Sequence, residues 1–177
     1  KEIAYLENRN TLKVYNIASK QSRTVLPADK NYSYADGDQY YTWSPDSKWL
    51  LVSFGPPQRI FTPEVGIVSA DGSGEVRNLT QSGYDDVAPK WAMDGKMMIW
   101  GSSREGTLAQ GGGATSGDVF GMYFTKAAYD RARLSKEEFA LKIPVVQGEY
   151  EQAHLCRLVG TLEIRSSQIK ASLPGGS

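Results

Sequence analysis

The sequence predicts an all-β fold: an incomplete β-propeller of about two and a half four-stranded blades, with a short helix and a β-like C-terminal tail. One observation is an internal repeat. A turn that leads into an apolar strand occurs at 41–54 and again at 89–101, with an offset of 48 residues. A period in this range is typical of propeller blades and of some helical repeats. The other observation is that these segments are rich in β-branched and aromatic residues and are separated by turn dipeptides, which favours the propeller.

Four residues anchor the repeat, and we predict that they are structural. Trp43 aligns with Trp91, and Asp46 aligns with Asp94. In the first copy, Pro45 fixes φ at the corner of a turn. In the second copy, a glycine follows Asp94 and takes positive φ without a steric penalty. The repeat therefore builds the fold, and no catalytic residue stands beside it.

Residues 1–125 are predicted to hold all the blade segments. The first, 1–27, is part of one blade, with strands expected near 3–6, 12–17 and 22–26. The middle of these alternates apolar and polar residues with a period of two, as a half-buried strand does.

Residues 38–80 are predicted to form a whole blade, and residues 86–125 a third, partial one. The strand at 49–54 belongs to the whole blade. In the third, the inner half at 86–103 is separated by a glycine-rich loop from an outgoing strand expected at 118–124.

The segment 126–142 is predicted to be helical. Ser135 is placed to cap a helix, because Glu138, three residues later, can reach back to its amide. Leu134 and Phe139 flank this box and can form a hydrophobic staple.

The composition excludes several partners. Basic and acidic residues number 20 each, so no basic face for nucleic acid is expected. No apolar run reaches the length of a transmembrane helix, so no membrane partner is predicted. Cys156 is the only cysteine, so no internal disulfide is expected. Because the sequence starts at Lys1 in the middle of a strand pattern, we expect the natural N-terminus to lie outside this sequence.

The two repeat copies resemble the propeller repeats of TolB and of tricorn-type serine peptidases. Trp43-Ser44-Pro45-Asp46 and Trp91-Ala92-Met93-Asp94-Gly95 carry the resemblance, which continues through 101–106, 118–129 and 134–139. It covers about 1–141. The resemblance implies a propeller that serves as a filter or scaffold, while the catalytic serine belongs to a separate domain. No catalytic residue can be carried over, so we expect a non-catalytic scaffold or substrate-access module, and whether this chain acts as an enzyme is left open.

The tail at 143–177 resembles a different family. Strand-like segments at 145–150 and 158–164 are similar to the substrate-binding β-sandwich of DnaK-type chaperones. This resemblance implies a peptide-binding fragment as the alternative function. Because the two families do not normally share a chain, an artificial chimera without natural function is a third hypothesis. The compartment stays open: periplasmic if the tricorn-like parent is exported, cytoplasmic if the chaperone-like part dominates.

Four aromatic residues near the start of the second blade form a weak candidate site for peptides. They are Tyr32, Tyr34, Tyr40 and Tyr41, which could line a surface at the propeller mouth or pack within the blade. His154 is the only histidine, and with Cys156 it falls short of the three or four ligands of a zinc site. We therefore predict no metal and no cofactor.

Two and a half blades cannot close a ring, so strand edges and apolar faces would be left open. The predicted partners are therefore copies of the chain or missing propeller blades, together with peptides.

Overall fold

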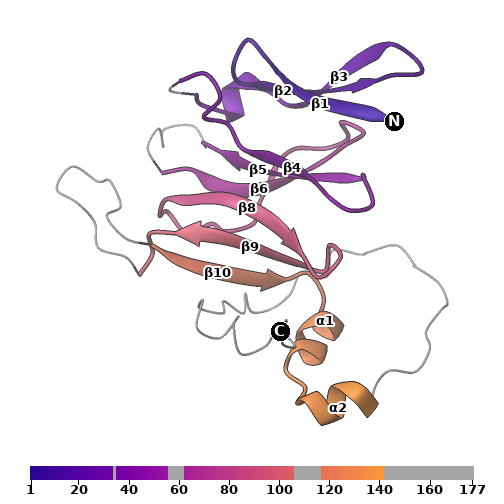
Figure 1. Cartoon of the computed structure of the whole chain (residues 1–177). Coiled ribbons are helices and arrows are strands. Elements are labelled where there is room, and N and C mark those ends of the chain that lie inside the picture. Colours follow the sequence, from indigo (N-terminus) through magenta and orange to yellow (C-terminus); the bar gives the residue numbers. More distant parts are fainter. Residues whose placement is uncertain (34, 56–61, 106–116, 142–177) are drawn as a thin grey trace.

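The computed structural model describes residues 1–33, 35–55, 62–105 and 117–141. In this part of the chain, ten strands form three antiparallel sheets that lie one upon another, and two short helices follow the last strand (Figure 1). The prediction of an all-β protein is confirmed. The strand-like segments predicted within 143–177 lie outside the described residues.

The first sheet has three strands in the order β1–β2–β3, namely β1 (Glu2–Glu7), β2 (Thr11–Asn16) and β3 (Gln21–Leu26). Its first turn places Asn8 and Arg9 in the left-handed region, with φ of 49° and 77°. On β2, Leu12 and Val14 are buried, while the alternate residues are less so. The predicted period of two is thus present.

The second sheet has four strands in sequence order, β4 (Tyr41–Trp43), β5 (Trp49–Phe54), β6 (Glu64–Ser69) and β7 (Arg77–Asn78). Leu50, Leu51 and Val52 on β5 are all buried, because the neighbouring sheets cover both faces. Gly66 on β6 has no room for a side chain: a Cβ would lie 2.7 Å from Val76 and 2.9 Å from Phe54. These two side chains close over the glycine.

The third sheet has the order β10–β9–β8, with β8 (Asp86–Ala92), β9 (Met97–Ser102) and β10 (Asp118–Tyr123). The outgoing strand predicted near 118–124 is present and pairs with β9. β8 is irregular between Val87 and Lys90, and Ala88 there has a φ of 50°.

The repeat seen in the sequence has the same register in two sheets. Trp43 lies opposite Leu50 in the second sheet, and Trp91 lies opposite Met98 in the third. A further repeat involves the lysine directly before β1, β5 and β9, whose carbonyl accepts a hydrogen bond from the amide just after the next strand. These bonds join Ile17 to Lys1 (3.2 Å), Ala70 to Lys48 (2.8 Å) and Phe124 to Lys96 (2.9 Å).

Apolar clusters fill both spaces between the sheets. The first interface, between the first and second sheets, holds Leu12, Val14, Val25, Leu26, Leu50, Val52, Phe54, Val68 and Ala70. The second interface, between the second and third sheets, holds Leu51, Val65, Ile67, Met98, Trp100 and Phe120. Each fully buried Val, Leu or Phe contributes about 1.5–3 kcal/mol, so these interfaces dominate the stability.

The helical segment contains two helices, α1 (Lys126–Ala132) and α2 (Lys136–Leu141), where one short helix was predicted. The hydroxyl of Thr125 caps α1 by accepting from the amide of Ala128 at 3.1 Å. The capping box predicted for the second helix is confirmed. The Ser135 amide donates to the Glu138 carboxylate (3.0 Å), and the Glu138 amide donates to the Ser135 hydroxyl (3.2 Å).

Candidate functional site

The four tyrosines predicted as a peptide surface differ in their surroundings. Tyr41 packs against the apolar cluster of the first interface, and its hydroxyl donates to the carbonyl of Ala4 at 3.4 Å. Tyr40 is half-buried, and Tyr32 in the preceding loop is 46% exposed. Tyr34 lies outside the described residues. Among the described tyrosines of this set, Tyr32 therefore has a large exposed surface, whereas Tyr41 packs in the core.

The two repeat tryptophans occupy equivalent places at successive interfaces. Trp43 packs against the cluster of the first interface, and Trp91 against that of the second. The Trp91 indole donates to the carbonyl of Thr42 at 3.2 Å, so it links the third sheet to the second. Its ring also lies 5.4 Å from that of Phe124, between ring centroids.

The two repeat aspartates lie in turns of different construction. The Asp46 carboxylate accepts from the hydroxyl of Ser44 (2.5 Å) and the amide of Lys48 (3.1 Å). Burial acts to raise the pKa of Asp46, but these hydrogen bonds outweigh it and the pKa is lowered. Asp94 is exposed and takes a left-handed conformation with φ of 52° before Gly95. Both turns thus contain a left-handed residue, which is Ser47 (φ of 59°) in the first turn, and the Asp46 side-chain bonds hold the first turn in addition.

The two turns also touch. A Cβ on Gly95 would lie 3.2 Å from Cδ of Pro45, so the glycine lets the turn of the third sheet approach that of the second. The proline of the first turn and the glycine of the second are therefore neighbours in space, although Gly95 aligns with Ser47 in the repeat.

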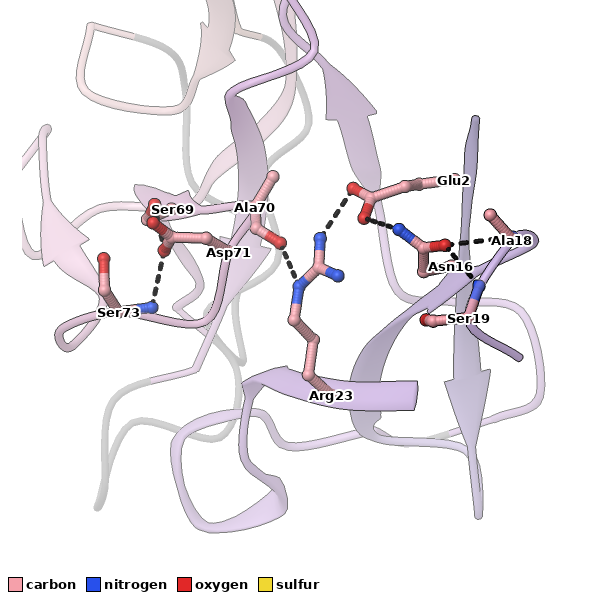
Figure 2. A network of polar contacts seen from close by, with 9 residues as sticks. All are labelled: Glu2, Asn16, Ala18, Ser19, Arg23, Ser69, Ala70, Asp71 and Ser73. Carbon is pink, nitrogen blue, oxygen red and sulfur yellow. Dashed lines mark hydrogen bonds and ion pairs between the residues drawn. The ribbon is translucent and has the colours of Figure 1, made fainter. Parts of the chain in front are cut away.

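A shallow groove of about 490 Å³ lies where the first and second sheets meet, at the end where β5 begins. It is lined by Glu2, Arg23, Ser47, Lys48, Trp49, Ser69, Ala70 and Asp71. Figure 2 shows Glu2, Arg23, Ser69 and Asp71 of this groove, with Arg23 between the two sheets. The Arg23 guanidinium donates to the Glu2 carboxylate at 2.6 Å and to the Ala70 carbonyl at 2.7 Å. Arg23 therefore joins two strands of its own sheet and also bridges to the second sheet.

The groove is lined by two acidic and two basic side chains, namely Glu2, Asp71, Arg23 and Lys48, and Arg23 forms an ion pair with Glu2. The hydrogen bond from Arg23 lowers the pKa of Glu2, and the same bond raises the pKa of Arg23. The pKa of Asp71 is lowered to about 2, because it accepts from the side chain of Ser73, the side chain of Ser69 and the Ser73 amide. These groups are therefore ionised at neutral pH, and the groove is polar without an excess of either charge.

Two buried carboxylates lie at the other end of the sheets, at the second interface. Glu64, at the start of β6, accepts from the Ser82 amide (3.1 Å) and the Gly83 amide (3.1 Å). Asp86, at the start of β8, accepts from the Ser82 hydroxyl (2.5 Å) and the indole of Trp100 (3.2 Å). Ser82 thus connects the two carboxylates, and donors from the protein hold the segment between β7 and β8 in place.

Asp85 lies beside this pair in a different electrostatic setting. Burial raises its pKa, and the negative charge of Asp86 raises it further. Its amide donates to the hydroxyl of Ser103 at 3.1 Å, while the Ser103 amide donates to its carbonyl at 3.1 Å. These backbone bonds fix Asp85 next to a like charge.

Sequence reasoning did not single out Arg23 or Glu64. For Glu64 a signal existed, because a carboxylate directly before the apolar run of β6 is at risk of burial and needs donors. For Arg23 there was none, since its partners Glu2 and Ala70 are brought to it only by strand pairing and sheet stacking.

Within the described ranges, no group of three or more His, Cys, Asp or Glu side chains is arranged to hold a metal ion. His154 and Cys156 lie outside these ranges. No helix in the described part is long and apolar enough to cross a membrane. Comparison with models of known protein families gave no match, and comparison with curated proteins gave none either.

Proposed function

We propose that the chain is part of a β-propeller and acts as a non-catalytic scaffold or substrate-access module of a tricorn-like peptidase. The observation that carries this proposal is the repeated sheet. Trp43 and Trp91 share one register, and the lysine carbonyls of Lys1, Lys48 and Lys96 accept equivalent hydrogen bonds. Sheets that repeat in register and stack face to face are what successive blades of a propeller require.

The polar clusters support a scaffold role. Arg23, Glu64 and Asp86 are each engaged by donors or acceptors of the protein itself, across or between strands. Side chains held in this way stabilise the stacking of the sheets, which is the work of a rigid support. Tyr32 offers an exposed aromatic surface to a passing peptide.

The experiment combines the chain with a tricorn-like peptidase whose own propeller has been removed. We expect the two to bind, and the ratio of long-peptide to short-peptide cleavage to change, because an access module selects substrates by size. The chain alone should leave fluorogenic peptides intact. Absence of binding, or cleavage by the chain alone that survives repurification, would overturn the proposal.

The alternative function, peptide binding by a DnaK-like fragment, depends on residues 143–177, which lie outside the described ranges. A titration of a fluorescent extended peptide separates the two. If the tail binds peptide, a chain that ends at residue 142 loses the signal; if Tyr32 and its neighbours bind it, the shorter chain keeps the signal. Sequencing of the source DNA tests the third hypothesis, an artificial chimera, which an uninterrupted natural gene would refute.

A further inference from the structure

The outer face of the first sheet carries apolar side chains that are partly open to solvent, beside the ion pair of Lys13 with Glu7. Ile3 is 51% exposed and Ile17 is 47% exposed. Tyr5 and Tyr15 lie on the same face, because they alternate with residues that point into the first interface. Among the described residues, no strand or helix packs on this face (Figure 1).

Equivalent positions in the second sheet are fully buried. The hydrogen bonds to the lysine carbonyls align Ile17 with Ala70, which is 3% exposed. The same alignment places Ile3 beside Leu50 in the repeat, and Leu50 is completely buried by the first sheet. The exposed face of the first sheet thus repeats a face that elsewhere in the chain binds a neighbouring sheet.

The third sheet exposes a face that corresponds to the other side of an interface between sheets. Val119 is 42% exposed and Val87 is 39% exposed, and both flank Gly101 on the side turned away from the second sheet. By the register of the repeat, Val119 corresponds to Val65, which is completely buried at the second interface. This face repeats the one that the second sheet presents to the third.

Helix α1 covers only part of that face. Ala128 packs with Met97 and Tyr123 at the end of the sheet where β9 begins, and Tyr129 lies against Tyr123 with 5.7 Å between ring centroids. Val87 and Val119 lie toward the other end of the sheet and stay exposed. The helix therefore leaves the half of the face around Gly101 open.

We propose that a second copy of this chain docks here, head to tail, with its first sheet on the third sheet of its neighbour. This inference rests on the proposed blade repeat. The two open faces correspond to the two sides of an interface that the chain already forms twice, so they match each other rather than themselves. Such a heterologous contact propagates into a closed ring or an open array, unlike a symmetric dimer.

Two variants test the contact. Ile3→Lys with Ile17→Lys blocks the first sheet, and Val87→Lys with Val119→Lys blocks the third. Both pairs of positions are exposed, so the chains should still fold, which circular dichroism checks. Glu75→Lys is the control, because it adds the same two units of charge at an exposed position of the loop between β6 and β7.

Sedimentation of the unmodified chain should show species larger than a monomer, and their population should grow with concentration. The Glu75→Lys control should associate to the same extent as the unmodified chain. Each blocked variant should associate roughly a hundredfold more weakly, because two buried apolar side chains are replaced by charges. An equimolar mixture of the two blocked variants should form a discrete 1:1 dimer, since one free face of each kind remains.

A monomeric unmodified chain, unchanged association of either blocked variant, or a mixture that fails to dimerise would overturn the inference. The proposed function is judged separately. A monomeric chain that still binds the propeller-deleted peptidase refutes only self-docking, whereas a chain that docks with itself but does not bind the peptidase refutes only the scaffold role.

Discussion

The two interfaces between the sheets are built from the same repeat but are held by different polar contacts. At the first interface, the bridge is Arg23, in a shallow open groove. At the second interface, the bond from Trp100 to Asp86 is buried, while the bonds from Ser82 to Asp86 and from Trp91 to Thr42 are partly buried. The apolar faces fix which sheets stack, while the polar groups determine how strongly each interface resists solvent, salt and pH.

The largest effect is expected for Trp100→Ala, at the second interface. The substitution removes a ring that packs on Phe120, 5.8 Å between centroids, and takes away the indole donor to Asp86. A loss of about 3–5 kcal/mol in the free energy of unfolding is expected. Urea denaturation measures it, with Trp100→Phe as the control that keeps most of the packing. A loss below about 1 kcal/mol for the alanine variant would mean that this interface is not closely packed.

The next effect is expected for Asp86→Asn. The amide is neutral, and it cannot accept from both the Ser82 hydroxyl and the Trp100 indole as a carboxylate does. Because hydrogen bonds to charged groups contribute about 1.5–3 kcal/mol, we expect a loss of about 2 kcal/mol. Asp94→Asn, at an exposed turn, should change stability by less than about 0.5 kcal/mol. Equal losses in the two variants would contradict the role given to burial.

These contacts show what could be read from the sequence and what could not. The sheets containing Trp43 and Trp91 were predicted because turn and strand signals are local, and their spacing repeats. The capping box at Ser135 was predicted for the same reason. The contacts of Arg23 were not predicted, because its partners are 21 and 47 residues away in the sequence. The local sequence around a polar residue on an outer strand does not indicate that a second sheet will lie beside it.

The tyrosines illustrate the same limit. Neighbouring residues on a strand point to opposite faces, so Tyr40 and Tyr41 could not both line one surface. Which of them would enter the core depends on the register of β4 against β5, where Tyr41 lies opposite Val52. Only the stacking of the first sheet made that face an interior one.

A smaller effect is expected for Arg23→Met, at the first interface. The side chains of Arg23 and Glu2 are 30% and 25% exposed, so water and salt weaken their attraction. We expect a loss of about 1 kcal/mol or less, which diminishes as sodium chloride is added. Lys13→Met breaks the ion pair with Glu7 on the outer face and serves as the control. A loss as large as that of Asp86→Asn, and insensitive to salt, would show that both interfaces are held alike.

The smallest effects concern pH, and they should have opposite signs at the two interfaces. The folded-state pKa of Asp71 is about 2, below the unfolded value of about 3.9. Its ionised form therefore stabilises the fold above about pH 4, and this contribution is lost as the pH falls toward 2. The folded-state pKa of Asp85 is raised by burial and by Asp86. Its contribution is therefore present below about pH 3.9 and is lost as the pH rises through the folded-state value.

The two asparagine variants separate these contributions in urea unfolding at several pH values. At pH 7, Asp71→Asn should be less stable than the unmodified chain, whereas Asp85→Asn should be more stable, because it removes a buried charge beside Asp86. Toward pH 2 both differences should shrink, since the aspartates are then protonated and resemble the amide in charge. If both variants shifted stability in the same direction at pH 7, the carboxylates of Asp71 and Asp85 would contribute to stability in the same way. The electrostatic contrast between the two interfaces would then be refuted.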